Sequence, residues 1–315
     1  MDKRIKVSIV MLTYNHEKYI RQAINSILMQ KTSFIYEIVV GDDCSKDCTP
    51  EILNEYKTKY PEIFNLVLRK KNIGVTRNLY DVCMKCRGEY IAFLEGDDYW
   101  TTTDKLQKQV DFLENHTDYS GVAHDYLMKD NSGKEYSHRK SNGEYTKKEF
   151  ALGLLPGQTG TMCMRNFLHD GVDDYKIIEN ASPNIGDRTL VLLMLVHGKV
   201  YSFSEKMSVY RVFSSESSWS KSLGKGATTK NPQYEDMCYY KALTQYSGKV
   251  WGIKISALSN KSYCVYAAIA RYRLTKTKQD KEVLLKTVKA YDESYILLIG
   301  CCIYLFLRNV IIKRK

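Results

Sequence analysis

Residues 88–100 read GEYIAFLEGDDYW, and this stretch decides the fold that the sequence predicts. The apolar run at 90–94 does not alternate with polar residues, which is typical of a strand buried on both faces of a parallel sheet. Three carboxylates follow the run and surround a glycine: Glu95, Asp97 and Asp98 around Gly96. Because three acids on one short loop repel one another, the pattern indicates either a solvated acidic turn or a site for a divalent cation.

Mg²⁺ or Mn²⁺ is the cation that such a loop favours. These hard ions bind one or two carboxylates and take their other ligands from phosphates and water. In open α/β sheets, ligands bind at the carboxyl ends of the strands, which is where this loop lies.

The first hundred residues alternate strand and helix signals. Apolar runs predict strands at 7–12, 34–40, 64–68 and 90–94, and helical spacing or capping predicts helices at 17–29, from Thr49 onward and at 75–86. This alternation predicts an α/β fold with a parallel sheet and right-handed crossovers. The loops at 13–15, 42–43 and 95–98 would then meet at one edge of the sheet.

Past residue 100 the signals are weaker. They predict helices at 104–115 and 190–197 and strands at 119–129, 161–164, 200–203 and 207–213. Residues 132–146 are polar, contain Gly and Ser, and are predicted to form a loop. Residues 214–232 are rich in Ser, Gly and Lys and are predicted to form a mobile lid. From residue 233 onward the pattern predicts helices.

The positive charge is concentrated at the end of the chain. The 315 residues carry a net charge of +11, and residues 249–315 hold 14 Lys and Arg against 4 Asp and Glu. The rest of the chain is nearly neutral. The basic tail therefore indicates an anionic surface as partner, and the neutral body does not favour nucleic acid.

Residues 295–312 are the most apolar part of that tail. The uncharged run Tyr295–Leu307 is shorter than the roughly 20 residues that span a membrane, and Arg308 interrupts it. We expect a helix that lies in the interface at the cytoplasmic face of the membrane. The alternative is a helix that packs on the protein itself or on a second subunit.

Nine cysteines are scattered along the chain. The charged start at 1–6 leads directly into a strand, so we expect no signal peptide, a cytoplasmic protein and reduced thiols. Cys83 and Cys86 fall within a helical pattern and lack the usual spacing of zinc ligands, so we expect no zinc site.

Several stretches together resemble the successive motifs of family-two glycosyltransferases with the GT-A fold. They are VSIVMLTYNHEKYI (7–20), EIVVGDDCSKDCTPEI (37–52), NIGVTRN (72–78) and GEYIAFLEGDDYW (88–100). GDRTLVLLMLVHGKV (186–200) and MSVYRVF (207–213) resemble the acceptor-side motifs of the same family. The resemblance covers roughly residues 5–215. It implies a doubly wound, mostly parallel sheet of GT-A type with a helical C-terminal extension.

The resemblance implies a donor-binding set: Thr13, Tyr14, Asn15, Glu17, Asp43, Asn72, Arg77, Glu95, Gly96 and Asp97. Thr13 and Tyr14 stand where the family contacts the nucleotide base, with the tyrosine ring stacked on uracil. Asp43 stands where the family hydrogen-bonds the base. The residues alone leave open that Tyr14 is an ordinary strand-end aromatic, that Asp43 caps the next turn and that Arg77 is a solvated helix charge.

The resemblance also implies the reacting groups. Glu95-x-Asp97 stands where the family has its Asp-x-Asp motif, so Asp97 is the expected ligand of Mn²⁺ or Mg²⁺. Asp187 stands where the family places its general base, and the N-terminus of the following helix should lower its pKa. The sequence leaves open that Asp187 only caps helix 188–197. Asp98 is the next candidate for the base.

This sequence departs from the family pattern at a few positions. Glu95 replaces the usual first aspartate, and Cys44 replaces a common glycine. Phe213 stands where many relatives have a histidine, which removes a contact expected to the metal or the diphosphate. The Gln-x-x-Arg-Trp motif of processive synthases is missing, which favours transfer of a single sugar.

The implied activity is the metal-dependent transfer of one sugar from a UDP-linked nucleotide sugar, with inversion at the anomeric carbon. The acceptor would be a hydroxyl of a glycan or lipid-linked glycan in cell-surface polysaccharide synthesis. Residues 1–232 would form the catalytic domain, with a nucleotide-binding half at 1–100 and an acceptor half at 101–232. Residues 233–315 would form a helical basic region. The alternatives are a sugar-nucleotide nucleotidyltransferase, disfavoured by the absence of a glycine-rich loop after the first strand, and a membrane or nucleic-acid binding module built on the tail.

Overall fold

The computed structural model describes residues 4–138, 142–151, 154–182, 186–212, 232–252 and 276–290, and single residues between 265 and 303. The chain divides into two compact units, residues 1–146 with 155–224 and residues 147–154 with 225–315. The site described below lies entirely in the first unit. Our domain boundary at residue 232 stays a prediction.

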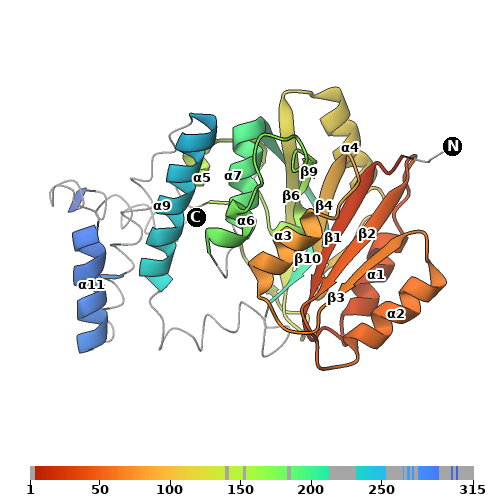
Figure 1. Cartoon of the computed structure of the whole chain (residues 1–315), viewed down its shortest axis with the longest axis horizontal. Helices are drawn as coiled ribbons and strands as arrows, with labels where there is room; N and C mark the ends of the chain where they lie inside the picture. The colour runs from red at the N-terminus through yellow and green to blue at the C-terminus, as the bar shows by residue number, and fades with distance from the viewer. Residues whose placement is uncertain are drawn as a thin grey trace. The chain divides into compact units, whose positions relative to one another are not determined.

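The first unit begins with the alternation that the sequence predicts (Figure 1). Its elements are β1 (Val7–Thr13), α1 (Ile20–Leu28), β2 (Tyr36–Asp42), α2 (Thr49–Lys59), β3 (Phe64–Leu68), α3 (Val75–Cys83) and β4 (Tyr90–Glu95). The residues of β1, β2 and β4 are almost all buried, because helices cover both faces of these strands.

The second half of this unit mixes short strands with helices. It contains β5 (Tyr99–Trp100), α4 (Lys105–Asn115), β6 (Tyr119–Lys129), β7 (Glu135–Tyr136), β8 (Gly143–Tyr145), the 3₁₀ turn η1 (Thr159–Thr161), β9 (Cys163–Arg165), α6 (Ile177–Asn180), α7 (Asp187–His197) and β10 (Lys199–Arg211). The second unit contains α5 (Lys147–Ala151), α9 (Pro232–Trp251) and α11 (Lys278–Ala290).

Two predictions about strands were wrong. The strands expected at 200–203 and 207–213 are one strand, β10, whose pairing with β6 shifts register on either side of Lys206. Such irregularities let one strand pass through a polar segment without ending. The polar loop expected at 132–146 contains the short strands β7 and β8. The predicted lid at 214–232 lies outside the described residues except for Pro232, as does most of the apolar segment at 295–312.

The sheet has the strand order β3-β2-β1-β4-β9-β6-β10-β5. The first four strands in this order are parallel, and β9 is antiparallel to both of its neighbours, β4 and β6. Because two reversals restore direction, β6 and β10 run the same way as β1 and β4. The carboxyl ends of all the long strands therefore lie at one edge of the sheet, which confirms the mostly parallel α/β fold.

Helices cover both faces of the parallel part. On one face, Ile9 and Met11 of β1 join a core with residues of α1, α2 and α4. On the other face, Leu79 of α3 lies beside Val10 and Phe93. The sheet is therefore doubly wound, as predicted.

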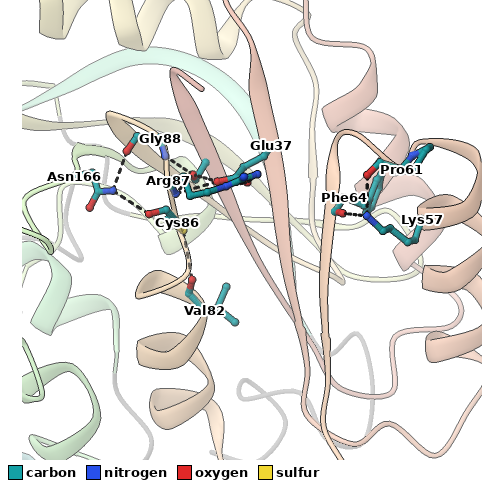
Figure 2. A network of polar contacts seen from close by, with 10 residues as sticks. Glu37, Lys57, Pro61, Phe64, Val82, Cys86, Arg87, Gly88 and Asn166 are labelled. Carbon is teal, nitrogen blue, oxygen red and sulfur yellow. Dashed lines mark hydrogen bonds and ion pairs between the residues drawn. The ribbon is translucent and has the colours of Figure 1, made fainter. Parts of the chain in front are cut away.

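A polar network fixes the opposite edge of the sheet, where the parallel strands begin (Figure 2). Glu37 is 1% exposed and accepts hydrogen bonds from Ser8 Oγ at 2.7 Å and from the backbone N–H of Arg87 at 3.0 Å. The Arg87 guanidinium donates to the same carboxylate at 2.6 Å, and Asn166 donates to the Gly88 carbonyl at 2.8 Å. A Cβ at Gly88 would lie 2.4 Å from the Ser8 nitrogen, so only glycine fits where β4 begins.

Candidate active site

Three loops that the sequence places at one sheet edge do lie side by side there. In the register of the sheet, Thr13 is opposite Asp42, and Leu12 is opposite both Gly41 and Glu95. The Asp43 N–H donates to the Thr13 carbonyl at 3.0 Å, and the Gly96 N–H donates to the Leu12 carbonyl at 2.8 Å. The ends of β1, β2 and β4 thus form one continuous surface.

The acidic loop contains two carboxylates, the half-buried Glu95 and the buried Asp98, that share one donor. Gln158 Nε2 donates to Glu95 Oε2 at 3.1 Å and to Asp98 Oδ2 at 3.0 Å. Burial raises the pKa of Glu95 to about 7, and the neighbouring Asp97 adds to the shift. Burial, followed by the charges of Asp97 and Glu95, raises the pKa of Asp98 well above its usual value. The loop therefore gains stability from any cation that binds it.

Asp97 lies beside the end of β1. Its Oδ2 is 3.9 Å from His16 Nε2. A Cβ at Gly96 would come within 2.9 Å of His16 Nδ1 and 3.0 Å of Thr13 Cβ, so glycine lets the loop close against β1. Within the described part of the chain, His16 Nδ1 and Thr13 Oγ1 are buried without a hydrogen-bond partner. Unpaired buried polar atoms at a strand end are typical of a ligand site.

The acidic loop can coordinate a divalent cation only when a bound ligand supplies some of the coordinating oxygens. Among the described residues, no group of three or more His, Cys, Asp or Glu side chains is placed to hold a metal ion. A cation bound through Asp97 would therefore take most of its oxygens from a diphosphate and water, which is the usual arrangement for Mg²⁺.

Two residues of the expected donor-binding set connect neighbouring loops. Asn15 has a left-handed backbone with φ of 58°, and its Oδ1 accepts a hydrogen bond from the Lys46 N–H at 2.7 Å. Glu17 Oε2 accepts from the Cys48 N–H at 3.0 Å. Both side chains hold the loop after β1 to the loop after β2, and Tyr14, which directly precedes Asn15, is half-buried.

The Asp43 carboxylate is engaged by backbone amides. It accepts from the Ile73 N–H at 2.8 Å and from the Gly74 N–H at 3.0 Å, and its own carbonyl accepts from Asn72 Nδ2 at 3.1 Å. These amides belong to the turn before α3, about thirty residues away, whereas the turn that directly follows Asp43 is bonded by Asp42, which accepts from the Ser45 N–H at 2.9 Å. The contact of Asp43 with a base stays a prediction. Arg77 is 62% exposed and pairs with Glu179 at 3.4 Å.

Asp187 opens α7 as its first helical residue, and Gly186 is the N-cap. Its Oδ1 accepts from the Arg188 N–H at 2.7 Å. Burial raises the pKa of Asp187, whereas we expected the helix N-terminus to lower it; removal from water outweighs the helix dipole here. A Cβ at Gly186 would lie 2.6 Å from Leu79, which places this end of α7 against α3.

Sequence reasoning missed three residues of the site: Gln158, Arg211 and His16, which stood in a quoted motif without a role and lies beside Asp97. Gln158 had no signal, because a single glutamine in a loop resembles any other. Arg211 lay in a motif that we quoted without assigning it a role. Its N–H donates to Asp98 Oδ1 at 2.7 Å, and its guanidinium donates to the Asp97 carbonyl. The guanidinium lies 5.0 Å from the ring centre of Tyr19 and 4.6 Å from that of Tyr99.

A family model described as "Glycosyl transferase family 2" matches residues 8–170, which include the acidic loop and the ends of β1, β2 and β4. The chain belongs to glycosyl transferase family 2. The match confirms the family resemblance of the sequence motifs. Family membership also favours glycosyl transfer over the nucleotidyltransferase and binding-module alternatives.

Two curated relatives of this family-2 chain illustrate its similarities. It is 47% identical over 212 residues to the uncharacterised protein Rv1520 of Mycobacterium tuberculosis, covering 65% of this chain and 58% of the relative. It is 36% identical over 107 residues to the putative teichuronic acid biosynthesis glycosyltransferase TuaG of Bacillus subtilis, covering 34% and 41%. The chain thus spans less than two thirds of the length of these relatives.

A solved structure supports the fold of this family-2 chain. The crystal structure of Staphylococcus aureus TarS residues 1–349 with UDP-GlcNAc matches with a TM-score of 0.64 at 18% identity, covering 90% of this chain and 79% of the crystallised TarS chain. At this identity the likeness shows the fold alone, and it confirms the predicted GT-A architecture. No helix in the described part of the chain is both long and apolar enough to cross a membrane.

Proposed function

We propose that this chain transfers a single sugar from a UDP-linked donor to a hydroxyl of a glycan or lipid-linked glycan, in the synthesis of a cell-surface polysaccharide. The observation that carries the proposal is the group of carboxylates Glu95, Asp97 and Asp98 at the shared carboxyl edge of β1, β2 and β4. Among related proteins, TuaG is named for teichuronic acid synthesis, and TarS has been crystallised with UDP-GlcNAc and with UDP.

The donor would lie across the ends of β1 and β2. Tyr14 offers a half-buried ring for the base, and the Thr13 hydroxyl, which has no hydrogen-bond partner among the described residues, offers a hydrogen bond beside it. Asn15 and Glu17 hold together the loops after β1 and β2, which would line the donor site. Asn72 and Asp43 hold the turn before α3 next to the end of β2, on the other side of the proposed donor site. Arg77 lies at the start of α3.

The diphosphate would lie over the acidic loop. A Mn²⁺ or Mg²⁺ ion bound there supplies Lewis-acid stabilisation of the leaving diphosphate. Asp97 is its proposed protein ligand. Glu95 and Gly96 shape the loop, and Arg211 brings a positive charge to the same place through its contact with the Asp97 carbonyl.

Asp187 would accept the proton of the acceptor hydroxyl. A carboxylate with a raised pKa is a stronger base than an ordinary one, so the raised pKa of Asp187 favours this role. Attack on the anomeric carbon from the side opposite the diphosphate would invert the configuration.

A thermal-shift screen with UDP, GDP, CMP and NAD, each with and without Mn²⁺, tests the donor proposal. UDP should raise the melting temperature in Mn²⁺ much more than in chelator, and Asp97→Ala should abolish the difference. The matched control is Asp111→Ala, which removes an exposed carboxylate on α4. A Mn²⁺-dependent UDP shift that survives in Asp97→Ala contradicts the metal assignment. A panel of UDP-sugars, scored for hydrolysis, then identifies the donor.

We further propose that residues 1–232 act as the catalytic domain and that the basic region 233–315 holds the protein to the inner face of the cell membrane or to a second copy. In its described part, Leu285 is 59% exposed on α11, a helix with several lysines, and Ile299 and Ile303 are 58% and 55% exposed. Deleting 290–315 should release the protein from anionic vesicles and leave donor hydrolysis intact. A truncated protein that loses its fold would show instead that the tail belongs to the core.

A further inference from the structure

Gln158 is bonded to the acidic loop by both hydrogens of one amide nitrogen. Its Nε2 lies 3.1 Å from Glu95 Oε2 and 3.0 Å from Asp98 Oδ2. Its Oε1 accepts from the Gly160 N–H at 2.8 Å. Turning the amide over would place its oxygen against two carboxylates and its nitrogen against an N–H, so the contacts define the orientation of the side chain.

The turn that carries Gln158 is itself held from outside. Trp100 Nε1 donates to the Gly160 carbonyl at 3.0 Å, and Gln109 Nε2 donates to the Thr161 carbonyl at 2.8 Å. Within the turn, Thr161 Oγ1 donates to the Gln158 carbonyl at 2.6 Å. A Cβ at Gly160 would lie 2.9 Å from Gln158 Oε1, so glycine at this position leaves room for the amide.

The amide also completes the bonding of Asp98. Asp98 Oδ2 accepts from Gln158, and Asp98 Oδ1 accepts from the Arg211 N–H at the end of β10. Asp98 is 2% exposed and is thus held between two other parts of the chain. Asp97, which comes between Glu95 and Asp98 in the sequence, is left with its carboxylate directed to the His16 side of the loop.

We propose that Gln158 is a positioning residue for the metal-binding loop. By bonding to Glu95 and Asp98 at once, it holds two mutually repelling carboxylates in place and so fixes the Gly96-Asp97 segment that lies between them. The inference rests on the proposed function, because it assumes that this segment binds a divalent cation together with UDP. Loss of residues that orient metal ligands typically costs about 10–100-fold in metal affinity.

The test measures the affinity of the wild type and three variants for Mn²⁺, each in saturating UDP. Electron paramagnetic resonance follows the signal of the Mn²⁺ that stays free. Gln158→Met keeps the size of the side chain and removes all three hydrogen bonds of the amide, and Gln158→Asn keeps the amide but shortens its reach. The matched control is Gln30→Met, because Gln30 likewise uses both ends of its amide: its Nε2 donates to the Thr102 carbonyl and its Oε1 accepts from the Leu106 N–H.

Both Gln158 variants should bind Mn²⁺ at least about tenfold more weakly, and Gln30→Met should bind it as the wild type does with a similar loss of melting temperature. Mn²⁺ affinity within twofold of wild type in either folded Gln158 variant overturns the proposal, as does an equal loss in Gln30→Met. If the wild-type protein with UDP takes up no Mn²⁺, the proposed function fails and this inference fails with it.

Discussion

Replacing Lys105 by methionine should flatten the dependence of stability on pH between 7.5 and 9.5. Lys105 is fully buried, and its Nζ donates to Gln109 Oε1 at 2.7 Å and lies 4.1 Å from the ring centre of Trp100. The titratable groups that act on it are His124 and Cys163. Burial lowers the pKa of His124 and raises that of Cys163 to about 12, so neither carries charge in this range.

Burial lowers the pKa of Lys105 from 10.5 to about 7. Between these values the unfolded chain holds a proton that the folded protein lacks, so stability rises with pH and is lost as pH falls toward 7. Below pH 7 Lys105 is protonated in both the folded and the unfolded state, so its contribution to the free energy of unfolding no longer changes with pH. With these two pKa values, the free energy of unfolding rises by about 2.5 kcal/mol between pH 7.5 and 9.5.

Urea unfolding of the wild type and Lys105→Met at pH 7.5, 8.5 and 9.5 measures this slope. The variant also loses the hydrogen bond to Gln109 and some packing, but those losses do not depend on pH and cancel when slopes are compared. The wild-type free energy of unfolding should rise by about 2.5 kcal/mol more than that of the variant. Profiles that stay parallel within about 0.5 kcal/mol would show that Trp100 and Gln109 keep the ammonium charged, and would refute the reasoning.

Two further predictions concern carboxylates at opposite edges of the sheet. Asp187→Asn should lower turnover by about a hundredfold or more while UDP affinity and melting temperature stay nearly unchanged; normal turnover would place the base elsewhere. Glu37→Gln should lower the free energy of unfolding by about 3 kcal/mol, because a buried carboxylate with several donors loses its charge, and UDP should still bind the folded variant. A stability loss below about 1 kcal/mol would show that the network at Glu37 contributes little.

The parallel half of the fold was predictable because its strands are buried on both faces. Burial on both faces requires unbroken apolar runs, as in β4, and such runs are visible in the sequence. The course of β10 was not predictable. Its polar residues near Lys206 resemble a turn, and only the pairing partner β6 shows that the strand continues through a change of register.

The candidate site was predictable in its location more than in its details. A sequence shows that Asp43 and Glu17 are acids at strand ends, but their hydrogen-bond partners lie about thirty residues away, in loops whose packing the local pattern does not specify. The same holds for Gln158, whose partners are 60 and 63 residues away. For Asp187, the helix N-terminus was visible in the sequence and the burial that reverses its effect was not.

The position of β9 between β4 and β6 has a consequence for how the chain is made. Once residue 95 has left the ribosome, β1 to β4 can pair with one another, but the outer edge of β4 pairs with β9 at residues 163–165. At about 5–20 residues per second, synthesis leaves that edge open for on the order of ten seconds or less. During this interval β4 presents unpaired N–H and C=O groups to which another nascent chain can add a strand. The yield of soluble protein, as distinct from its final stability, therefore depends on how quickly the later segment closes the edge of β4.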